Sequence, residues 1–394
     1  MTGDILTLNC GSSSVKFAVF DAGAPDAPAQ ITGKIAGIGR APTFQARDAN
    51  GQLHTPDPLN ALTPTHTHED LIPRLLEWLV QQRGAHPLRM VGHRVVHGGK
   101  TYTEPTRITP NVMAALDALC PLAPLHQPHN LAAIRAVAAW QPDIPQIACF
   151  DTAFHQTQDR IQTLFALPRA LGDEGIVRYG FHGLSYAYIA SILPQHLGMR
   201  AEGRVIVAHL GNGASMCAME GRKSKATTMG FTALDGLVMG RRSGTLDPGV
   251  ILYLMQSKGM SAADVETLLY RKSGLLGVSG ISNNMHDLEL SHAPEAREAI
   301  DLFVSRAART LAGLIPAIGG LDAVVFTAGI GENSAPVRAA ICAQLNWLGL
   351  HLDPNANARG DVKISAPNSA VDVLVLPTDE EAVIANACRA QLAI

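Results

Sequence analysis

The sequence predicts an α/β protein built from two related domains. Its 394 residues are more than one ordinary hydrophobic core accommodates, so two domains are expected. A buried strand, a turn of small residues and a return strand occur over residues 5–20 and again over residues 204–219. The same hairpin in both halves indicates a duplicated domain, with a ligand held in the cleft between the copies.

The composition favours a compact enzyme. Apolar residues make up 47% of the chain and charged residues 16%, below the roughly 25% that is usual for charge. The net charge of −3 gives no electrostatic basis for binding nucleic acid or an anionic membrane. Six cysteines without C-x-x-C spacing favour free thiols in a reducing compartment. With neither a signal-peptide pattern nor an apolar run of membrane length, we expect a cytoplasmic protein.

In the first half, short strands precede a helical segment. Leucines at 71, 75, 76 and 79 share one face of the first expected helix, and Pro110 suits the start of the second. The expected strands are 5–8, 15–20, 30–35, 43–45, 52–54, 90–97 and 146–150, and the expected helices are 68–83, 110–119 and 130–139.

The second half alternates strands and helices around two further turns of small residues. One turn, 211–215, follows the strand 204–210, and the other, 328–333, follows the strand 321–326. We expect a surface loop at 355–368. The remaining expected elements are a helix just after His182, helices 247–258, 262–270, 294–318, 335–345 and 380–392, and a strand at 371–376.

The first turn, Asn9–Lys16, has the chemistry of a phosphate site. Small residues let backbone N–H groups approach an anion, the serine hydroxyls add donors, and Lys16 adds a positive charge. An ordinary polar hairpin turn explains this stretch equally well when it is taken alone.

Arginines and histidines in glycine-rich surroundings strengthen the phosphate interpretation. Arg94 and Arg242 carry guanidinium groups, which bind carboxylate or phosphate in a bidentate manner. Taken singly, Arg94 is better explained as a structural ion pair and His182 as a helix cap. We expect His66 and His68 to be solvated. The joint occurrence of these groups with three glycine-rich turns favours an anion-binding site.

Seven motifs in order then resemble the acetate kinases, members of the acetate/sugar kinase, Hsp70 and actin superfamily. The similarity covers nearly the whole chain. The motifs are NCGSSSVK at 9–16, GHRVVHGG at 92–99, FDTAFHQT at 150–157, YGFHGLS at 179–185, HLGNGAS at 209–215, FTAGIGENS at 326–334 and PTDEE at 377–381.

The resemblance implies two RNase H-like domains of the actin/Hsp70 type, with the active site in the cleft between them. Residues 1–151 plus about 382–394 would form the N-terminal domain, closed by the C-terminal helix. Residues from about 152 to 381 would form the C-terminal domain, which carries most nucleotide contacts. The implied protein is a homodimer that transfers a phosphoryl group reversibly from ATP to acetate, giving acetyl phosphate and ADP.

The resemblance also assigns roles to individual residues. Asn9 and Glu380 would hold Mg²⁺, with Mn²⁺ as an alternative. Asp151, His182 and Arg242 would be catalytic. Arg94, Val96, Leu125 and Phe181 would bind the acyl substrate. The nucleotide and its phosphates would contact Ser12, Ser14, Lys16, His126, His209, Leu210, Gly211, Asn212, Gly213, Asn284, Met285, His286, Gly329, Ile330, Gly331, Glu332 and Asn333.

The chemistry of acetate bears on the role of Asp151, the family's assigned acid/base. A free carboxylate with a pKa near ~4 is ionised at pH 7 and needs no general base. The obstacle is the approach of one anion to another, so charge neutralisation and alignment should dominate. We therefore hypothesise that Asp151 mainly orients Arg94, Arg242 or metal-bound water.

Some positions depart from the family's pattern. Arg241 stands where Thr is usual, Thr245 where Asp is usual, and Ala233 where Pro is frequent. A smaller residue at 233 widens the acyl pocket and predicts some propionate activity, because discrimination per methylene is roughly 1–3 kcal/mol. The segment 284–286 also departs, which leaves the preference between ATP and other nucleotides open. The alternative functions are a propionate kinase and an actin/Hsp70-like ATPase without an acyl acceptor.

Overall fold

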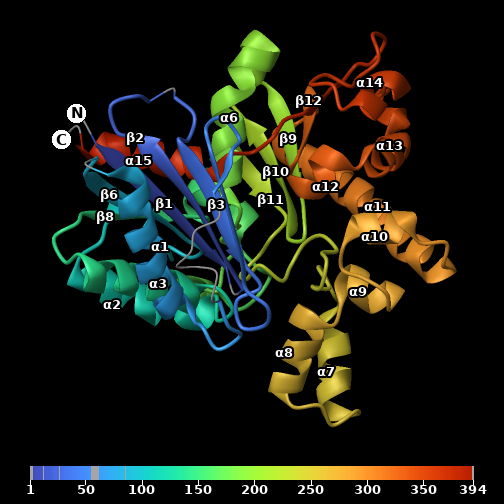
Figure 1. Cartoon of the computed structure of the whole chain (residues 1–394). Helices are drawn as coiled ribbons and strands as arrows, with labels where there is room; N and C mark the ends of the chain where they lie inside the picture. Colours follow the sequence, from blue (N-terminus) through green and yellow to red (C-terminus); the bar gives the residue numbers. More distant parts are fainter. Residues whose placement is uncertain (1–2, 12, 26, 55–61, 85, 393–394) are drawn as a thin grey trace. The chain divides into compact units, whose positions relative to one another are not determined.

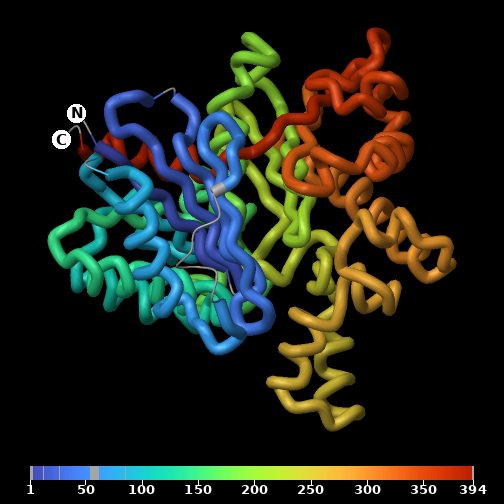
Figure 2. The backbone as a smooth tube through the Cα atoms, viewed as in Figure 1, coloured from blue at the N-terminus to red at the C-terminus, as the bar shows by residue number. Residues whose placement is uncertain are grey.

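The computed structural model (Figure 1) describes residues 3–11, 13–25, 27–54, 62–84 and 86–392, and these form two compact units. Unit 1 contains residues 1–153 and 379–394, and unit 2 contains residues 154–378. The tube in Figure 2 shows the red C-terminal segment returning to the blue N-terminal strands, so unit 1 is built from both ends of the chain. Within the described part of the chain, no helix is both long and apolar enough to cross a membrane.

Unit 1 is a sheet in the strand order β5-β4-β3-β2-β1-β6-β8-β7. β1 pairs with β2 antiparallel and with β6 parallel, and β6 pairs with β8 parallel. Its elements are β1 (Asp4–Gly11), β2 (Ser14–Asp21), β3 (Ile31–Ala36), β4 (Thr43–Asp48), β5 (Leu53–His54), α1 (His68–Arg83), β6 (Leu88–Val95), β7 (Thr106–Arg107), α2 (Pro110–Ala118), α3 (Gln127–Trp140), β8 (Gln146–Phe150) and α15 (Glu380–Leu392).

Helices α1 and α15 show how the sequence builds this unit. Thr67 caps α1 by accepting from the N–H of Asp70, and the predicted leucine face of α1 is buried in the main core of the unit. α15 contacts β1 and β6. A Cβ on Gly92 would lie 2.3 Å from Ile384 Cγ2, so the glycine lets α15 approach β6 closely.

Unit 2 is a five-stranded sheet in the order β11-β10-β9-β12-β13. Its elements are α4 (Arg160–Thr163), α5 (Arg169–Glu174), α6 (Gly183–Leu197), β9 (Arg204–Leu210), β10 (Ala214–Glu220), β11 (Lys223–Thr227), α7 (Pro248–Gln256), α8 (Ala262–Arg271), α9 (Gly274–Ser279), α10 (Met285–Leu290), α11 (Pro294–Leu314), β12 (Ala323–Thr327), α12 (Ala328–Asn333), α13 (Ala335–Ala343), α14 (Pro354–Arg359) and β13 (Asp372–Val375).

The predicted duplication is confirmed by the two sheets. The order β3-β2-β1-β6-β8 in unit 1 matches β11-β10-β9-β12-β13 in unit 2, with the antiparallel and parallel pairings in the same places. Each copy therefore begins with an antiparallel hairpin and adds two parallel strands beside its first strand.

Three sequence expectations are corrected. The expected turn 328–333 is the short helix α12. The expected loop 355–368 begins with α14, because Asp353 caps Asn355 and Ala356 and Pro354 occupies the first turn. Helix α3 begins at Gln127 rather than at 130, with Pro128 inside its first turn.

Candidate active site

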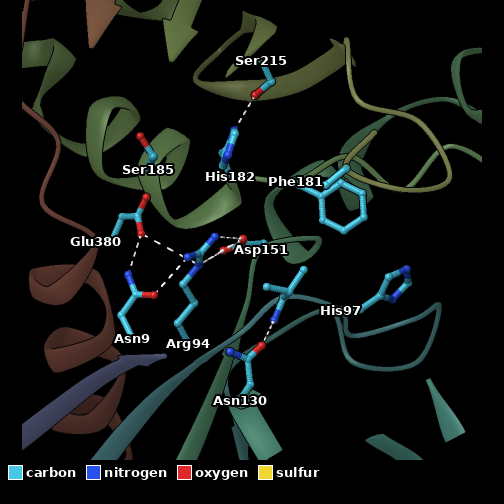
Figure 3. A network of polar contacts seen from close by, with 12 residues as sticks. Asn9, Arg94, His97, Asn130, Asp151, Phe181, His182, Ser185, Ser215 and Glu380 are labelled. Atoms are coloured by element: carbon cyan, nitrogen blue, oxygen red, sulfur yellow. Dashed lines mark hydrogen bonds and ion pairs between the residues drawn. The ribbon is translucent and has the colours of Figure 1, made fainter. Parts of the chain in front are cut away.

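In unit 1, the guanidinium of Arg94 is the centre of a polar cluster (Figure 3). Its Nε donates to Asp151 Oδ1 at 2.9 Å, and its Nη2 to Asp151 Oδ2 at 2.5 Å. Nη1 donates to Asn9 Oδ1 at 3.0 Å, and Nε lies 3.9 Å from Glu380 Oε2. Burial lowers the pKa of Arg94, but Asp151 and Glu380 outweigh it, so the net shift is upward. Arg94 therefore stays charged.

The cluster forms because neighbouring strands end together. Asn9 lies near the end of β1, Arg94 near the end of β6, and Asp151 directly follows β8. Since β1, β6 and β8 run parallel, their carboxyl ends meet at one edge of the sheet, where ligands commonly bind in α/β folds. Glu380 reaches this edge as the first residue of α15, and its Oε2 accepts from Asn9 Nδ2 at 3.2 Å.

The β1–β2 turn is held by side chains from two helices. Asn130 of α3 donates to the carbonyl of Cys10 at 2.6 Å, and His68 Nε2 lies 2.7 Å from the carbonyl oxygen of Gly11. His68 is 5% exposed, so the expectation that it is solvated is wrong. Nothing in its Thr-rich sequence indicates this tertiary contact. Ser12, a predicted phosphate ligand, lies outside the described residues, and Ser14 begins β2.

Lys16 lies opposite Asn9 in the hairpin register and is exposed. It lines a cavity of about 210 Å³ together with Asp379 and Glu381. Burial and the neighbouring Glu380 raise the pKa of Glu381, and the charge of Lys16 opposes that shift. This end of unit 1 thus brings together one lysine and several carboxylates.

Two further predicted acyl-binding residues of unit 1, Val96 and Leu125, lie beyond the ends of its elements. Val96 follows β6 and is 4% exposed, and its N–H donates to Asn130 Oδ1 at 3.0 Å. Leu125 and His126 are partly buried and directly precede α3. The His126 N–H donates to the carbonyl of Ala123, which closes the turn before the helix.

In unit 2, two histidines stack on each other with a ring-centroid distance of 4.2 Å. His182 Nδ1 lies 2.8 Å from Ser215 Oγ (Figure 3), and His209 Nδ1 lies 2.8 Å from Ser185 Oγ. Tyr186 hydrogen-bonds the same Ser215 hydroxyl. His182 has a backbone φ of 59°, which is strained for a non-glycine residue. Strained backbone conformations of this kind cluster at functional sites. Serine hydroxyls therefore fix the orientation of both imidazoles.

Gly213 leaves space in front of Arg242 and His182. A Cβ at Gly213 would lie 3.0 Å from Arg242 Nη2 and 3.2 Å from His182 Nε2, so these two nitrogens converge on one position. The guanidinium of Arg242 is held in place by a hydrogen bond, in which its Nη1 donates to the carbonyl of Ala233 at 2.7 Å. Phe181 is 2% exposed, and its carbonyl oxygen lies 2.9 Å from His155 Nε2.

A cavity in unit 2, of about 280 Å³, gathers eight of the seventeen residues predicted to contact the nucleotide and its phosphates. It lies where the β9–β10 turn, α10 and α12 meet. Its lining residues are Gly211, Asn212, Asn284, Met285, His286, Glu289, Gly329, Ile330, Asn333 and Ser334. Sequence reasoning missed Glu289 and Ser334, which hydrogen-bond each other. Ser334 is recognisable as the cap before Pro336 of α13, but no sequence signal pairs it with Glu289.

Other residues predicted to contact the nucleotide do not line this cavity but lie in the elements around it. Leu210 and His209 belong to β9, and Gly331 is buried within α12. The carboxylate of Glu332 turns back into its own segment, where Oε1 accepts from the Ala328 N–H at 2.7 Å. Arg338, also missed, is 1% exposed and donates to the carbonyls of Gly331 and Glu332.

The departures from the family's pattern have local partners. Arg241 Nη2 donates to Asn283 Oδ1 at 3.2 Å, and Asn283 in turn donates to Asn212 Oδ1 at 3.1 Å. The unusual arginine is thus linked to the cavity through two amides. The Thr245 hydroxyl donates to Asp235 at 2.7 Å, a bond that an ionised Asp at 245 would replace with repulsion.

Comparison with known proteins identifies the family. The model of the acetokinase family matches residues 4–386. The chain is 53% identical to an acetate kinase of Rhodopseudomonas palustris, over 98% of this chain and 97% of that one. A solved acetate kinase of Porphyromonas gingivalis has a TM-score of 0.87 at 35% identity, covering 99% of this chain and 100% of that one. A solved propionate kinase of Francisella tularensis has a TM-score of 0.90 at 35% identity, covering 98% of this chain and 98% of that one. The chain belongs to the acetokinase family.

Proposed function

We propose that this protein transfers a phosphoryl group reversibly between ATP and acetate, producing acetyl phosphate and ADP. The observation that carries the proposal is that each unit holds one arginine in place at its candidate site. Arg94 is fixed by Asp151, and Arg242 by the carbonyl of Ala233. An ATPase that only hydrolyses ATP has no need of two arginines for a carboxylate acceptor, whereas a kinase acting on an anionic acceptor does.

The two units would supply different parts of the reaction. Arg94 would bind the acetate carboxylate, and Arg242 with His182 would neutralise charge on the phosphoryl group as it moves in line. Val96, Leu125 and Phe181 would surround the acetate methyl group. The attacking carboxylate is already ionised, so no residue needs to remove a proton from it.

The nucleotide would be bound chiefly by unit 2. The cavity of about 280 Å³ has apolar walls at Met285 and Ile330 and amides at Asn212, Asn284 and Asn333. Apolar walls with a few polar groups suit a nucleobase and ribose. Ser12, Ser14, Lys16, His126 and the segment 209–213 would contact the phosphates.

A divalent metal, Mg²⁺ or Mn²⁺, would be held by Asn9 and Glu380. Within the described residues, no group of three or more His, Cys, Asp or Glu side chains forms a ready-made metal site. Asn9 and Glu380 are nevertheless neighbours, since Asn9 Nδ2 donates to Glu380 Oε2 at 3.2 Å. One amide and one carboxylate form a ligand set that fits Mg²⁺, which is commonly held by one or two side chains plus phosphates and water. When bound, the ion would neutralise phosphate charge. Asp151 would hold Arg94 in place.

We also propose that the protein is a homodimer in the cytoplasm. α7, with the sequence PGVILYLMQ, is apolar on all sides, yet none of its residues is buried and Leu252 and Tyr253 are each 54% exposed. A helix that is apolar all round is normally covered, and a second copy of the chain is the proposed cover. Light scattering should give the dimer mass, and Leu252→Glu with Tyr253→Glu should give the monomer. A wild-type monomer would contradict the proposal.

The decisive experiment measures the acyl phosphate trapped as its hydroxamate, with acetate, propionate and butyrate as acceptors and with ATP and GTP as donors. We expect acetate-dependent product, with weaker activity on propionate because of Ala233. A propionate kinase is the second candidate, favoured by the Francisella tularensis structure and by Ala233. ATP consumption that depends on neither added acetate nor added propionate would contradict both candidates. Equal efficiency on butyrate would exclude an acetate-shaped pocket.

A further inference from the structure

The side-chain amide of Asn130 joins the ends of two strands that carry proposed active-site residues. Its Nδ2 donates to the carbonyl of Cys10 at 2.6 Å, and its Oδ1 accepts from the N–H of Val96 at 3.0 Å. Cys10 directly follows Asn9 on β1, and Val96 lies just beyond Arg94 of β6. Asn130 is only 1% exposed, so both bonds are made away from water.

This bridge lies just beyond the backbone pairing of β1 with β6. The parallel register of these strands ends with the pair Leu8 and His93. A primary amide offers one N–H side and one carbonyl side, as a peptide group does. Asn130 therefore connects the two strands where their own pairing has ended, through hydrogen bonds of 2.6 and 3.0 Å that limit the separation of the strand ends.

The separation matters for the residues that lie between the last backbone pair and the bridge. Asn9 and Arg94 occupy that interval, and their side chains meet at 3.0 Å. Gln127, one turn earlier on α3, makes a different contact. It binds the N–H and the carbonyl of His97, so it fastens the chain beyond β6 without reaching β1. Of these two amides of α3, Asn130 is thus the one that hydrogen-bonds to the ends of both strands.

We propose that Asn130 is a positioning residue for phosphoryl transfer, because it sets the spacing between the strand ends that carry Asn9 and Arg94. The inference rests on the roles proposed above for those two residues. Asn130 itself need not touch acetate, nucleotide or metal.

The first test is Asn130→Asp, which preserves shape and the acceptor for Val96. The ionised carboxylate cannot donate to the Cys10 carbonyl, so kcat for acetyl phosphate formation should fall about tenfold or more at pH 8, with KM for ATP changed less than about threefold. Burial raises the pKa of such a carboxyl group, and its protonated form can donate as the amide does. The ratio of variant to wild-type kcat should therefore rise as the pH is lowered toward 6.

The second test is a double-mutant cycle between Asn130→Ala and Asn9→Ala. If Asn130 acts through the placement of Asn9, its loss should cost much less in the Asn9→Ala background than in the wild type. A matched control is Gln146→Leu, which removes another buried amide of unit 1, the hydrogen-bond partner of His93. It should lower the unfolding temperature and leave kcat within about threefold.

Three results would overturn the inference. The first is a ratio of Asn130→Asp to wild-type kcat that does not change with pH. The second is a double variant of Asn130→Ala and Asn9→Ala whose decrease in kcat is the product of the two single decreases, and the third is a decrease in kcat for Gln146→Leu as large as that for the Asn130 variants. If Asn130→Ala is too unstable to assay, the pH dependence of Asn130→Asp decides alone. Full activity of Asn9→Ala and Arg94→Lys would instead contradict the proposed roles of Asn9 and Arg94, whatever the Asn130 variants do.

Discussion

The two sheets share a topology but organise their polar groups in opposite ways. In unit 1 the carboxyl ends of the parallel strands carry opposite charges that bind each other, as in the pair Arg94 and Asp151. In unit 2 the corresponding region relies on serine hydroxyls that orient His182 and His209, on glycines that open space beside them, and on Arg242, which a backbone carbonyl holds. The duplicated backbone thus provides a frame, and the residues at the strand ends decide what each copy can bind.

The largest expected effect comes from breaking the charged cluster of unit 1. Arg94→Ala removes the guanidinium proposed to bind acetate and leaves Asp151 buried without that partner. We expect kcat/KM for acetate to fall by about 10³ or more, measured by the hydroxamate assay. The control is Arg135→Ala, which breaks an exposed pair with Asp117 in the same unit and should change activity less than about twofold. Comparable losses in both variants would show that the cluster has no special role.

Acidification should lower the stability of unit 1 more than that of unit 2. Burial lowers the pKa of His93 and of His97 to about 4, and both belong to unit 1. Between pH 6.5 and 4 the unfolded chain binds protons that the folded unit does not, so stability falls as the pH falls through this window. Each imidazole removes up to about 3 kcal/mol by pH 4.

Hydrogen exchange followed separately in each unit measures this effect. Amides of unit 1 should lose protection first on acidification. The double variant His93→Gln with His97→Gln should weaken the pH dependence of amide protection in unit 1. If unit 2 loses protection first, or if the pH dependence is unchanged in the double variant, His93 and His97 are not the groups that destabilise unit 1 in acid.

Asp151→Asn tests whether the charged cluster orients or titrates. The carboxylate accepts twice from Nε and Nη2 of Arg94, which suits an orienting group. We expect kcat to fall about 10²-fold with the pH profile of kcat unchanged in shape. If the acidic limb of the profile disappears in the variant, Asp151 is an acid/base and the orienting role is wrong.

The smallest effect is expected in the histidine and serine cluster of unit 2. Ser215→Ala removes the hydroxyl that hydrogen-bonds both His182 Nδ1 and Tyr186, and loss of the bond to His182 predicts a decrease in kcat of about tenfold. Ser191→Ala, on the exposed face of α6, is the matched control and should be neutral. Equal kcat in both variants would mean that the orientation of His182 does not depend on Ser215.

Local pattern predicted much of the fold. The strand 146–150 and the helices 68–83 and 380–392 have the expected bounds, because apolar periodicity and capping residues act over short distances. Helix α14 was missed since its residues lack an apolar face, and α12 since glycines normally indicate a turn. The expected site residues Asn9, Arg94, Asp151 and Glu380 do come together in unit 1.

The sequence alone determined the main strands and longer helices in their order, the repeated hairpin and the motifs that mark the family, because each is encoded in neighbouring residues. Only the tertiary structure decided which groups support the site. His68 was expected in solvent and lies under the β1–β2 turn, while Asn130 and Arg338 carried no signal until the fold buried them. The physical reason is that a buried polar side chain must find its partner wherever the chain places it, and partners 57 or 120 residues away leave no pattern in local sequence.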